Sequence, residues 1–327
     1  MKKIKSIALA LILILLSCCD NVIEYKKNDC PPIDIVSYSP YNNPIWHPNG
    51  KLIGFNYVPL DSITYPYGKE CMGKQYINYK KAGFWLINSD GTNQRRILQY
   101  QLQSAVWSPD GKWIAFVSGA QIYKMPFDGV NFDTTSVVKL TDTGRNYFPS
   151  WRPDGQWITY DSNKDSPNGM NFVWEMKSDG TQKRRILYEP QFGEIRMPSY
   201  SREATKIVLI RYKETPSSEL HIIDRSGLNS KRITNNNVFD SYPRFYSEGR
   251  IVFWSDNSIC IIDTTGKNYK QLTPKGVGAS FGLPFSVSPN EEEIAYTKYN
   301  SDDWTFTNGT LWMLNIKTNQ NRQLTFN

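Results

Sequence analysis

The feature that most constrains this chain of 327 residues is a short phrase that recurs along it. Its clearest copy occupies residues 149–160 and reads Pro-Ser-Trp-Arg-Pro-Asp-Gly-Gln-Trp-Ile-Thr-Tyr. Pro153 presets φ for the second residue of a type I turn, and Gly155 closes the turn at no steric cost. The aromatic and β-branched residues that follow are typical of a strand. The phrase therefore predicts a β-hairpin, which needs further strands to be stable.

Six copies of the phrase can be aligned on the position just before the turn. These positions are Trp46, Trp107, Trp151, Tyr200, Phe245 and Val287. Neighbouring copies are 61, 44, 49, 45 and 42 residues apart. A period in the forties is typical of a four-stranded propeller blade. The longer first step predicts that the first copy carries an insertion of roughly 15 to 20 residues relative to that period.

Each copy continues with a second half that predicts two more strands. The third copy has Val-Trp-Glu-Met at 173–176 before a polar turn, and the fifth has Ile-Cys-Ile-Ile at 259–262. A short last strand then ends in Arg-Ile-Leu, Lys-Leu-Thr or Gln-Leu-Thr. Four strands per copy and no helical periodicity predict an all-β fold. We expect residues 33–327 to form a six-bladed β-propeller of four-stranded antiparallel blades, and this propeller to be monomeric.

The repeat resembles that of a known family. Its Pro-x-Trp-Ser-Pro-Asp-Gly pattern with a trailing Leu-Thr is similar to the repeat of the TolB-type six-bladed β-propellers, which are relatives of the Trp-Asp repeat family. The resemblance covers about residues 40–327. TolB-type proteins also carry an N-terminal α/β domain, for which this sequence has no room, and copies four to six have lost all or part of the Pro-Asp-Gly turn. The resemblance implies an envelope protein that binds protein partners, such as a peptidoglycan-associated lipoprotein.

The first 17 residues have the composition of a secretory signal. A lysine-rich start precedes an unbroken apolar run at 7–16, which is much shorter than the roughly 20 residues of a membrane-spanning helix. The run ends Leu-Leu-Ser-Cys, which resembles a bacterial lipobox with Cys18 as the lipidated residue. Cleavage before Cys19 and an ordinary signal with a stray thiol are the alternatives. We expect 1–17 to be a lipoprotein signal peptide and 18–32 a lipidated tether, which holds the chain at the bacterial outer membrane.

The insertion in the first copy, residues 58–80, is a candidate binding loop. Loops that project from a rigid β scaffold often carry binding residues, although a packed surface loop is an equal alternative. Its candidate residues are Tyr65, Tyr67, Tyr76 and Tyr79. Export would place the cysteines in an oxidising compartment, so we expect a disulfide between Cys30 and Cys71. Cys260, between two isoleucines, is predicted to be a buried apolar residue.

Most tryptophans are predicted to pack between blades rather than to bind a ligand. Of the ten, only Trp254 and Trp304 fall outside the repeat positions.

The net charge of the chain gives no support for a polyanionic partner. The formal net charge is +7, and removing 1–17 takes away three lysines and leaves a value near +4. This dispersed charge argues against nucleic-acid binding.

The chain shows little sign of catalytic chemistry. Residues 278–282 read Gly-Ala-Ser-Phe-Gly, the pattern of a hydrolase nucleophile elbow, which requires a histidine later in the chain. The two histidines, His47 and His221, both precede it and lie in different copies, so we also expect no metal site and no cofactor.

The sequence predicts a non-enzymatic propeller that binds a protein, or else a cell-surface glycan or peptide. Binding would occur at the channel mouth or at the insertion. The alternative is a lyase or hydrolase acting in the central funnel.

Overall fold

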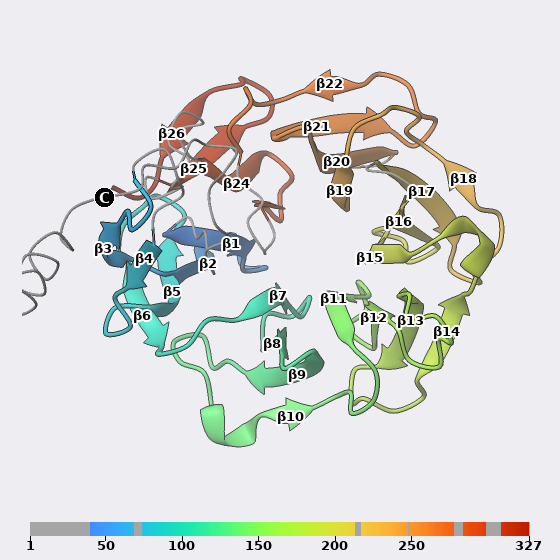
Figure 1. The fold of residues 1–327 in the computed structure, drawn as a ribbon, viewed down its shortest axis with the longest axis horizontal. Helices are drawn as coiled ribbons and strands as arrows, with labels where there is room; N and C mark the ends of the chain where they lie inside the picture. The colour runs from blue at the N-terminus through green and yellow to red at the C-terminus, as the bar shows by residue number, and fades with distance from the viewer. Residues whose placement is uncertain are drawn as a thin grey trace, which may run out of the picture. The chain divides into compact units, whose positions relative to one another are not determined.

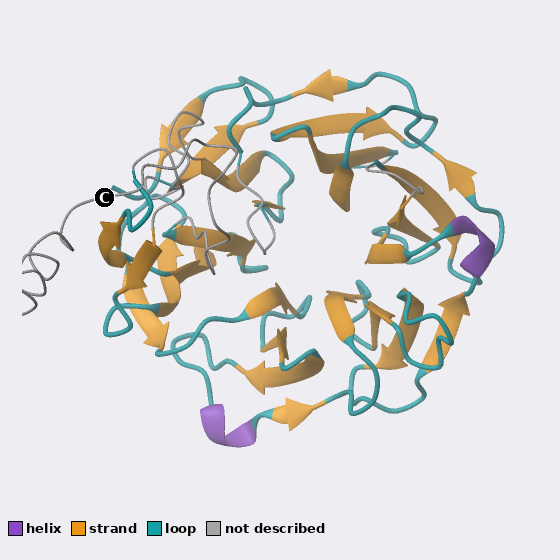
Figure 2. Cartoon of the chain, in the orientation of Figure 1, coloured by secondary structure: helices purple, strands orange, loops and turns teal. Residues whose placement is uncertain are grey.

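The computed structural model describes residues 40–68, 74–212, 217–247, 249–277, 284–298 and 309–326. The chain divides into a body, 38–59 with 77–327, and a smaller unit that includes 60–76. In the body, six four-stranded antiparallel sheets stand radially around one axis (Figure 1). This confirms the predicted all-β, six-bladed propeller. The helical segments among the described residues are two short 3-10 turns (Figure 2), η1 (Thr134–Ser136) and η2 (Pro190–Phe192).

In every blade the strands run outward from the axis in chain order. Blade one holds β1 (Tyr41–Trp46), β2 (Leu52–Tyr57), β5 (Gly83–Asn88) and β6 (Arg95–Leu98); blade two holds β7 (Gln103–Trp107), β8 (Trp113–Ser118), β9 (Gln121–Pro126) and β10 (Val138–Lys139). Blade three holds β11 (Asn146–Trp151), β12 (Trp157–Ser162), β13 (Phe172–Lys177) and β14 (Arg184–Leu187); blade four holds β15 (Ile195–Tyr200), β16 (Lys206–Tyr212), β17 (Ser218–Asp224) and β18 (Lys231–Arg232). Blade five holds β19 (Asp240–Tyr246), β20 (Arg250–Ser255), β21 (Ser258–Asp263) and β22 (Lys270–Gln271); blade six holds β23 (Phe285–Val287), β24 (Glu293–Lys298), β25 (Thr310–Asn315) and β26 (Asn321–Gln323).

The ring closes where blade six meets blade one. There β1 contacts β23, β24 and β25. The Trp46 amide donates a hydrogen bond to Ser286 Oγ at 3.0 Å, and Arg322 Nη2 donates to the Ser89 carbonyl at 2.7 Å. The four described strands of each blade all come from one stretch of chain. Residues 33–39, the first of the predicted propeller range, lie outside the described residues.

The turn of the repeated phrase keeps one backbone shape even where its sequence has drifted. Gly50, Gly111 and Gly155 close the turn with φ of 69°, 69° and 70°, in the left-handed region that glycine reaches without strain. In blades four and six the same position is held by Ala204 and Glu291, with φ of 56° and 60°. The loss of Pro-Asp-Gly therefore changed the turn's composition and not its conformation.

The trailing Leu-Thr has a structural role in four blades. Its aliphatic residue is buried in each, and the hydroxyl of its threonine accepts a hydrogen bond from the third strand of the same blade. The pairs are Thr141 with the Ile122 amide (2.8 Å), Thr234 with Leu220 (2.9 Å), Thr273 with Ile259 (2.9 Å) and Thr325 with Leu311 (2.9 Å). The motif thus joins the outermost strand to its neighbour where the ladder between them is short.

The tryptophans of the phrase pack between blades, as predicted. Trp46, Trp107 and Trp151 are all under 9% exposed. Trp113 of the second copy is half-buried, and the Lys124 ammonium covers one face of its ring at 4.4 Å from the centroid. Cys260 is buried and not in a disulfide, as expected.

The predicted first-blade insertion forms an element of its own. Between β2 and β5, β3 (Leu60–Thr64) and β4 (Lys74–Ile77) make a two-stranded sheet. After β3, the Gly68 amide donates to the Tyr65 carbonyl at 3.2 Å and so closes a tight turn. The longer first step of the repeat is therefore explained by an inserted β-ribbon.

Candidate functional site

The tyrosines predicted as a binding loop are divided between the two units of the chain. Tyr65, Tyr67 and Tyr76 belong to the inserted unit, whereas Tyr79 lies in the stretch that leads into β5. Tyr79 is 78% exposed, Tyr76 is 43% exposed and Tyr65 is 38% exposed. Tyr67 is half-buried. Three of the four rings therefore face solvent, as a binding role requires.

Several other predicted positions lie outside the described residues. These are the signal peptide 1–17, the tether 18–32 with Cys18 and Cys30, Cys71, the 278–282 stretch and Trp304. Among the residues that are described, no helical segment has the length and hydrophobicity needed to cross a bilayer. In the same residues no three His, Cys, Asp or Glu side chains gather closely enough to hold a metal ion. His47 contacts Trp107 in blade two, and His221 lies in blade four.

A bulge that the sequence analysis missed shapes the innermost strand of blades one to five. In each of these strands the register slips by one residue three positions before the phrase's aromatic. The residue at the slip has a left-handed backbone, with φ between 48° and 56° in all five blades: Asn43, Ser104, Phe148, Met197 and Tyr242. Such bulges re-aim a side chain. A proline follows the slip in four of the five blades, and a proline inside a predicted strand could have indicated it.

The bulge side chains of blades three, four and five meet one another. The rings of Phe148 and Tyr242 are 5.9 Å apart, although blade four lies between their two sheets. The Tyr242 amide lies 3.4 Å from the Met197 sulfur. At this level, side chains reach across from neighbouring inner strands and fill the space beside the axis.

Next to this cluster a buried carboxylate joins blade three to blade four. Asp161 of β12 is fully buried, and its Oδ2 accepts hydrogen bonds from the Met197 amide (3.1 Å) and from Arg196 Nε (3.2 Å). Desolvation raises the pKa of Asp161 to about 6, because burial outweighs the attraction of Arg196, and the charge of Glu194 adds to the rise. The Arg196 guanidinium also lies 5.3 Å from the centre of the Phe148 ring.

A groove of about 1240 Å³ opens between blades three and four, and we call it the blade-four groove. Its lining runs from Glu194, just before β15, to Arg232 in β18, and includes residues of β16 and β17 between them. Its other wall is formed by Met170 and by the linker around η2. Its lining is Met170, Glu189, Pro190, Gln191, Gly193, Glu194, Arg211, Tyr212, Ser217, Glu219, His221, Ser230, Arg232 and Asn237.

Two ion pairs hold the charged side chains of the groove in place. Arg211 and Glu219 face each other in the β16–β17 register, and their side chains are only 8% and 1% exposed. Arg211 pairs with Glu189 and donates to Ser230 Oγ at 3.0 Å. Arg232 Nη2 donates to Glu219 Oε1 at 2.8 Å. In each pair one partner is buried, Arg211 or Glu219, and the other reaches toward solvent, so the pairs hold the buried charges in place.

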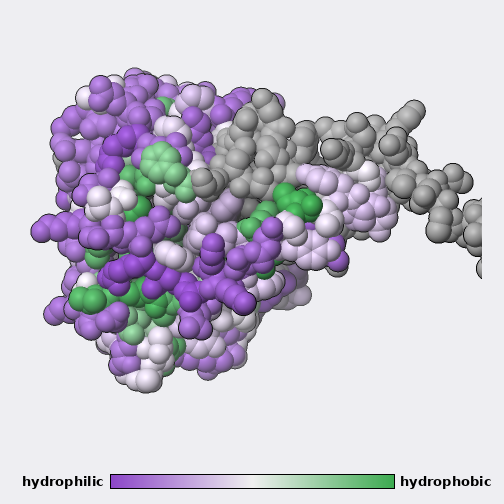
Figure 3. Space-filling view, turned by 90° about the vertical axis from the view of Figure 1, so that its left-hand side faces the viewer, coloured by the Kyte–Doolittle hydropathy of each residue, from purple (hydrophilic) through white to green (hydrophobic). Residues whose placement is uncertain are grey.

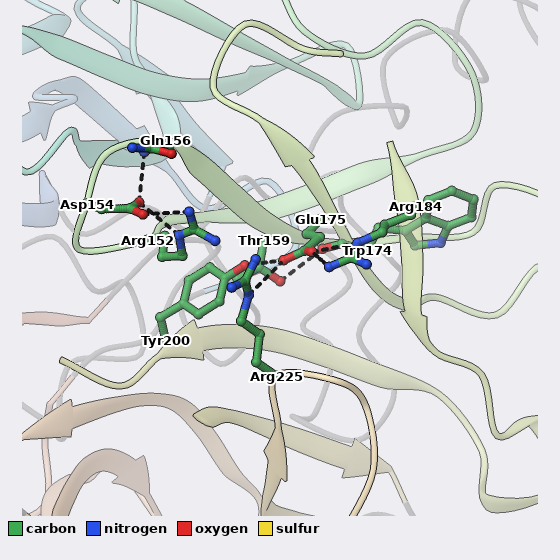
Figure 4. Close-up of polar contacts among 9 residues, drawn as sticks. All are labelled: Arg152, Asp154, Gln156, Thr159, Trp174, Glu175, Arg184, Tyr200 and Arg225. Atoms are coloured by element: carbon green, nitrogen blue, oxygen red, sulfur yellow. Dashed lines mark hydrogen bonds and ion pairs between the residues drawn. The ribbon is translucent and has the colours of Figure 1, made fainter. Parts of the chain in front are cut away.

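A second buried network joins blades three and four at the end of the sheets where the phrase turns lie (Figure 4). The fully buried Glu175 accepts hydrogen bonds from Arg184 Nε at 2.7 Å and from the Tyr200 hydroxyl at 2.7 Å. Arg225 Nε lies 3.8 Å from the same carboxylate. Arg152 pairs with Asp154 at 2.5 Å. Because the partners come from both blades, the network fixes one sheet against the next.

The chain was compared with protein families and with solved structures. No family model matches it, and no curated protein matches it. A protein assigned as TolB from Agrobacterium tumefaciens is 16% identical with a TM-score of 0.59, over 73% of this chain and 84% of that one. TolB from Acinetobacter baumannii is 17% identical with a TM-score of 0.57, over 86% of this chain and 62% of that one. An oligogalacturonate lyase from Vibrio parahaemolyticus is 10% identical with a TM-score of 0.53, over 90% of this chain and 79% of that one.

These similarities concern the fold. The chain spans less than two thirds of the Acinetobacter TolB, and every identity is below the level at which activity transfers with structure. The same six-bladed architecture therefore serves a TolB protein in one case and a lyase in another. This chain shares the propeller fold of TolB structures.

Proposed function

We propose that this protein is a lipid-anchored propeller of the bacterial cell envelope that binds a protein partner without catalysing a reaction. The observation that carries the proposal is the match of the body to two TolB structures. The exposed rings of Tyr76 and Tyr79 support it, because tyrosine supplies contact area at a low cost in conformational entropy. On the face shown in Figure 3 hydrophilic residues dominate, and hydrophobic ones form small separate groups. That surface fits a reversible partner better than an obligate one.

Partner capture from crosslinked envelopes tests the protein-binding role. The full chain is tagged at its C-terminus and compared with a Tyr76→Ala/Tyr79→Ala variant. We expect one envelope protein to be enriched with the unmodified chain and reduced at least about tenfold with the variant, as for the loss of aromatic contacts at an interface. Tyr100→Ala is the control, because Tyr100 is 45% exposed and lies outside the insertion. Equal capture by all three chains would remove the insertion from the proposal.

The anchor is tested separately. Cys18→Ser should release the protein from the membrane fraction, since the lipid is attached through that thiol, whereas Cys19→Ser should leave it there. Release by Cys19→Ser instead would move the anchor by one residue. Fractionation of inner and outer membranes then locates the anchored form. Retention of both variants in the membrane would exclude a lipid anchor at either position.

A second candidate is a propeller enzyme that acts on a carbohydrate in the central funnel. The observation in its favour is Glu194, a carboxylate in the lining of the blade-four groove whose charge acts on Arg196, since lyases and hydrolases both need acid–base groups. Incubation with oligogalacturonate, followed by detection of the unsaturated product, tests it. Turnover that disappears in Glu194→Gln would favour the enzyme over the binding protein.

A further inference from the structure

The blade-four groove has the shape of a site for an extended ligand. Its lining runs from Glu194, just before β15, to Arg232 in β18. Its volume of about 1240 Å³ is at or above the upper end of the range of small-molecule pockets. A ligand of several linked units would use this length better than a single small molecule.

The lining of the groove suits a ligand rich in hydroxyl groups. Most lining residues carry polar groups, but apolar atoms form the larger part of the lining surface, with Met170, Pro190 and the ring of Tyr212 among the contributors. Donors such as Arg232 and Asn237 lie in the same groove as carboxylate acceptors such as Glu189. A hydroxyl both donates and accepts, so a polyhydroxylated ligand can use both kinds of wall group. A lipid or another apolar ligand would leave these groups desolvated.

The charge of the groove disfavours an anionic ligand. Three carboxylates, of Glu189, Glu194 and Glu219, lie in the lining with two guanidiniums, of Arg211 and Arg232, so carboxylates outnumber guanidiniums. Each guanidinium is already ion-paired within the wall. A phosphate or a uronic-acid chain would have to displace these pairs, whereas a neutral ligand leaves them intact.

The direction of the groove disfavours a peptide. Peptides that bind to β-proteins usually add a strand along a free sheet edge, or insert apolar anchors into pockets. The groove runs across strand ends instead of along an edge, and its wall offers few apolar anchor sites. Together with the rigid ion pairs, this leaves a preorganised polar channel that loses little entropy on binding.

We propose that the blade-four groove binds a neutral oligosaccharide in an extended conformation. None of the residues that line the groove is among the tyrosines proposed to contact the protein partner. A failure of one proposal therefore leaves the other standing.

Titration of the purified full chain with defined hexasaccharides tests the proposal. Cellohexaose, maltohexaose and chitohexaose are the neutral probes. An array of neutral and acidic glycans, screened first, decides which of them is titrated. Hexagalacturonate and a lysine-containing hexapeptide are the comparators. We expect a neutral probe to bind with Kd of about 1 mM or below, at least about tenfold more tightly than either comparator.

Two variants locate the site. Gln191→Ala and Asn237→Ala remove exposed groove side chains without touching the buried ion pairs, and each should weaken binding about threefold to tenfold, as expected for a lost hydrogen bond. Gln156→Ala, an exposed glutamine on the phrase turn of blade three, should bind as the unmodified chain does. Absence of binding by every neutral glycan, tighter binding of hexagalacturonate or of the peptide, or equal affinity in all three variants would each overturn the proposal.

Discussion

At residue 204 an alanine occupies a backbone conformation that glycine would hold with less strain. Its φ of 56° is in the left-handed region, where a side chain costs roughly 1–2 kcal/mol relative to the right-handed region. Gly155 holds the equivalent position in blade three with φ of 70°. A Cβ added to Gly155 would lie 3.9 Å from Pro109 Cδ, an ordinary contact, so the two positions differ in backbone preference and not in available space.

We therefore expect Ala204→Gly to increase the free energy of unfolding, and Gly155→Ala to decrease it, each by about 1 kcal/mol. Urea denaturation of both variants beside the unmodified protein measures the changes. A decrease on Ala204→Gly would mean that the flexibility of glycine in the unfolded chain outweighs the relief of strain.

The buried carboxylate of Asp161 makes a prediction about pH. Its pKa is raised to about 6 in the folded state, so the folded protein holds this proton more tightly than the unfolded chain does. The stability that the proton contributes is fully present below pH 4 and is lost as the pH rises through 6. Asp161→Asn removes the titration while keeping the shape.

The stability of the unmodified protein relative to Asp161→Asn should therefore fall by about 2.5 kcal/mol between pH 4 and pH 7. Comparing the two proteins cancels the exposed aspartates whose pKa values are lowered, such as Asp90 and Asp263. Chemical denaturation at several pH values measures the difference. A difference that stays constant with pH would show that Arg196 fully compensates the buried charge.

At the scale of single elements, the threonine of the trailing Leu-Thr explains why such short outer strands stay attached. β22 has only two residues, yet the buried Thr273 hydroxyl holds the Ile259 amide of β21. Removing that acceptor leaves a buried N–H without its partner.

Thr273→Val should lower the free energy of unfolding by about 1–3 kcal/mol, because valine keeps the volume but cannot accept the hydrogen bond. Thr318→Val is the matched control, since Thr318 is exposed on the last turn of blade six and should change stability by no more than about 0.5 kcal/mol. Thermal denaturation of both variants decides. Equal effects of the two substitutions would mean that the threonine of the trailing Leu-Thr recurs for a reason other than its hydrogen bond to the third strand.

The sequence determines the elements more directly than the site. The turns with Gly50, Gly111 and Gly155, and the aromatic strands after them, carry their conformation in local chemistry, so strand order and blade number could be predicted. The groove could not, because it depends on a linker from blade three that folds beside blade four. A partial signal existed in β16, where Arg211 shares a face with the buried Ile207 and Leu209. A charge on an apolar face indicates a buried ion pair or a site.

At the scale of the whole molecule, the seam between blades six and one joins the last described strands of the chain to the first. The two blades are therefore held together there by packing and hydrogen bonds and not by a linker between consecutive strands. Leu324, 3% exposed, packs there in one cluster with Trp46 and Ile87 of blade one and Met313 of blade six. Leu272 is the equivalent residue in blade five, and it belongs to a different cluster from Leu324.

Both Leu324→Ala and Leu272→Ala should cost about 2–5 kcal/mol, as for other buried leucines. Only Leu324→Ala should also speed hydrogen exchange of the β1 amides, because it loosens the joint that β1 makes with blade six. Hydrogen-exchange mass spectrometry of the β1 amides distinguishes the Leu324→Ala variant from the Leu272→Ala variant. Equal protection of β1 in both variants would mean that residues outside the described strands lock the ring.

The bulge position of the inner strands tolerates many different side chains. One backbone shape accommodates asparagine, serine, phenylalanine, methionine and tyrosine at Asn43, Ser104, Phe148, Met197 and Tyr242. The strand pairing on either side of the bulge fixes the path of the backbone, so this path does not depend on which side chain stands at the bulge. Substitutions at these positions can therefore change the packing between neighbouring inner strands, one blade at a time, while the path of the strands stays the same.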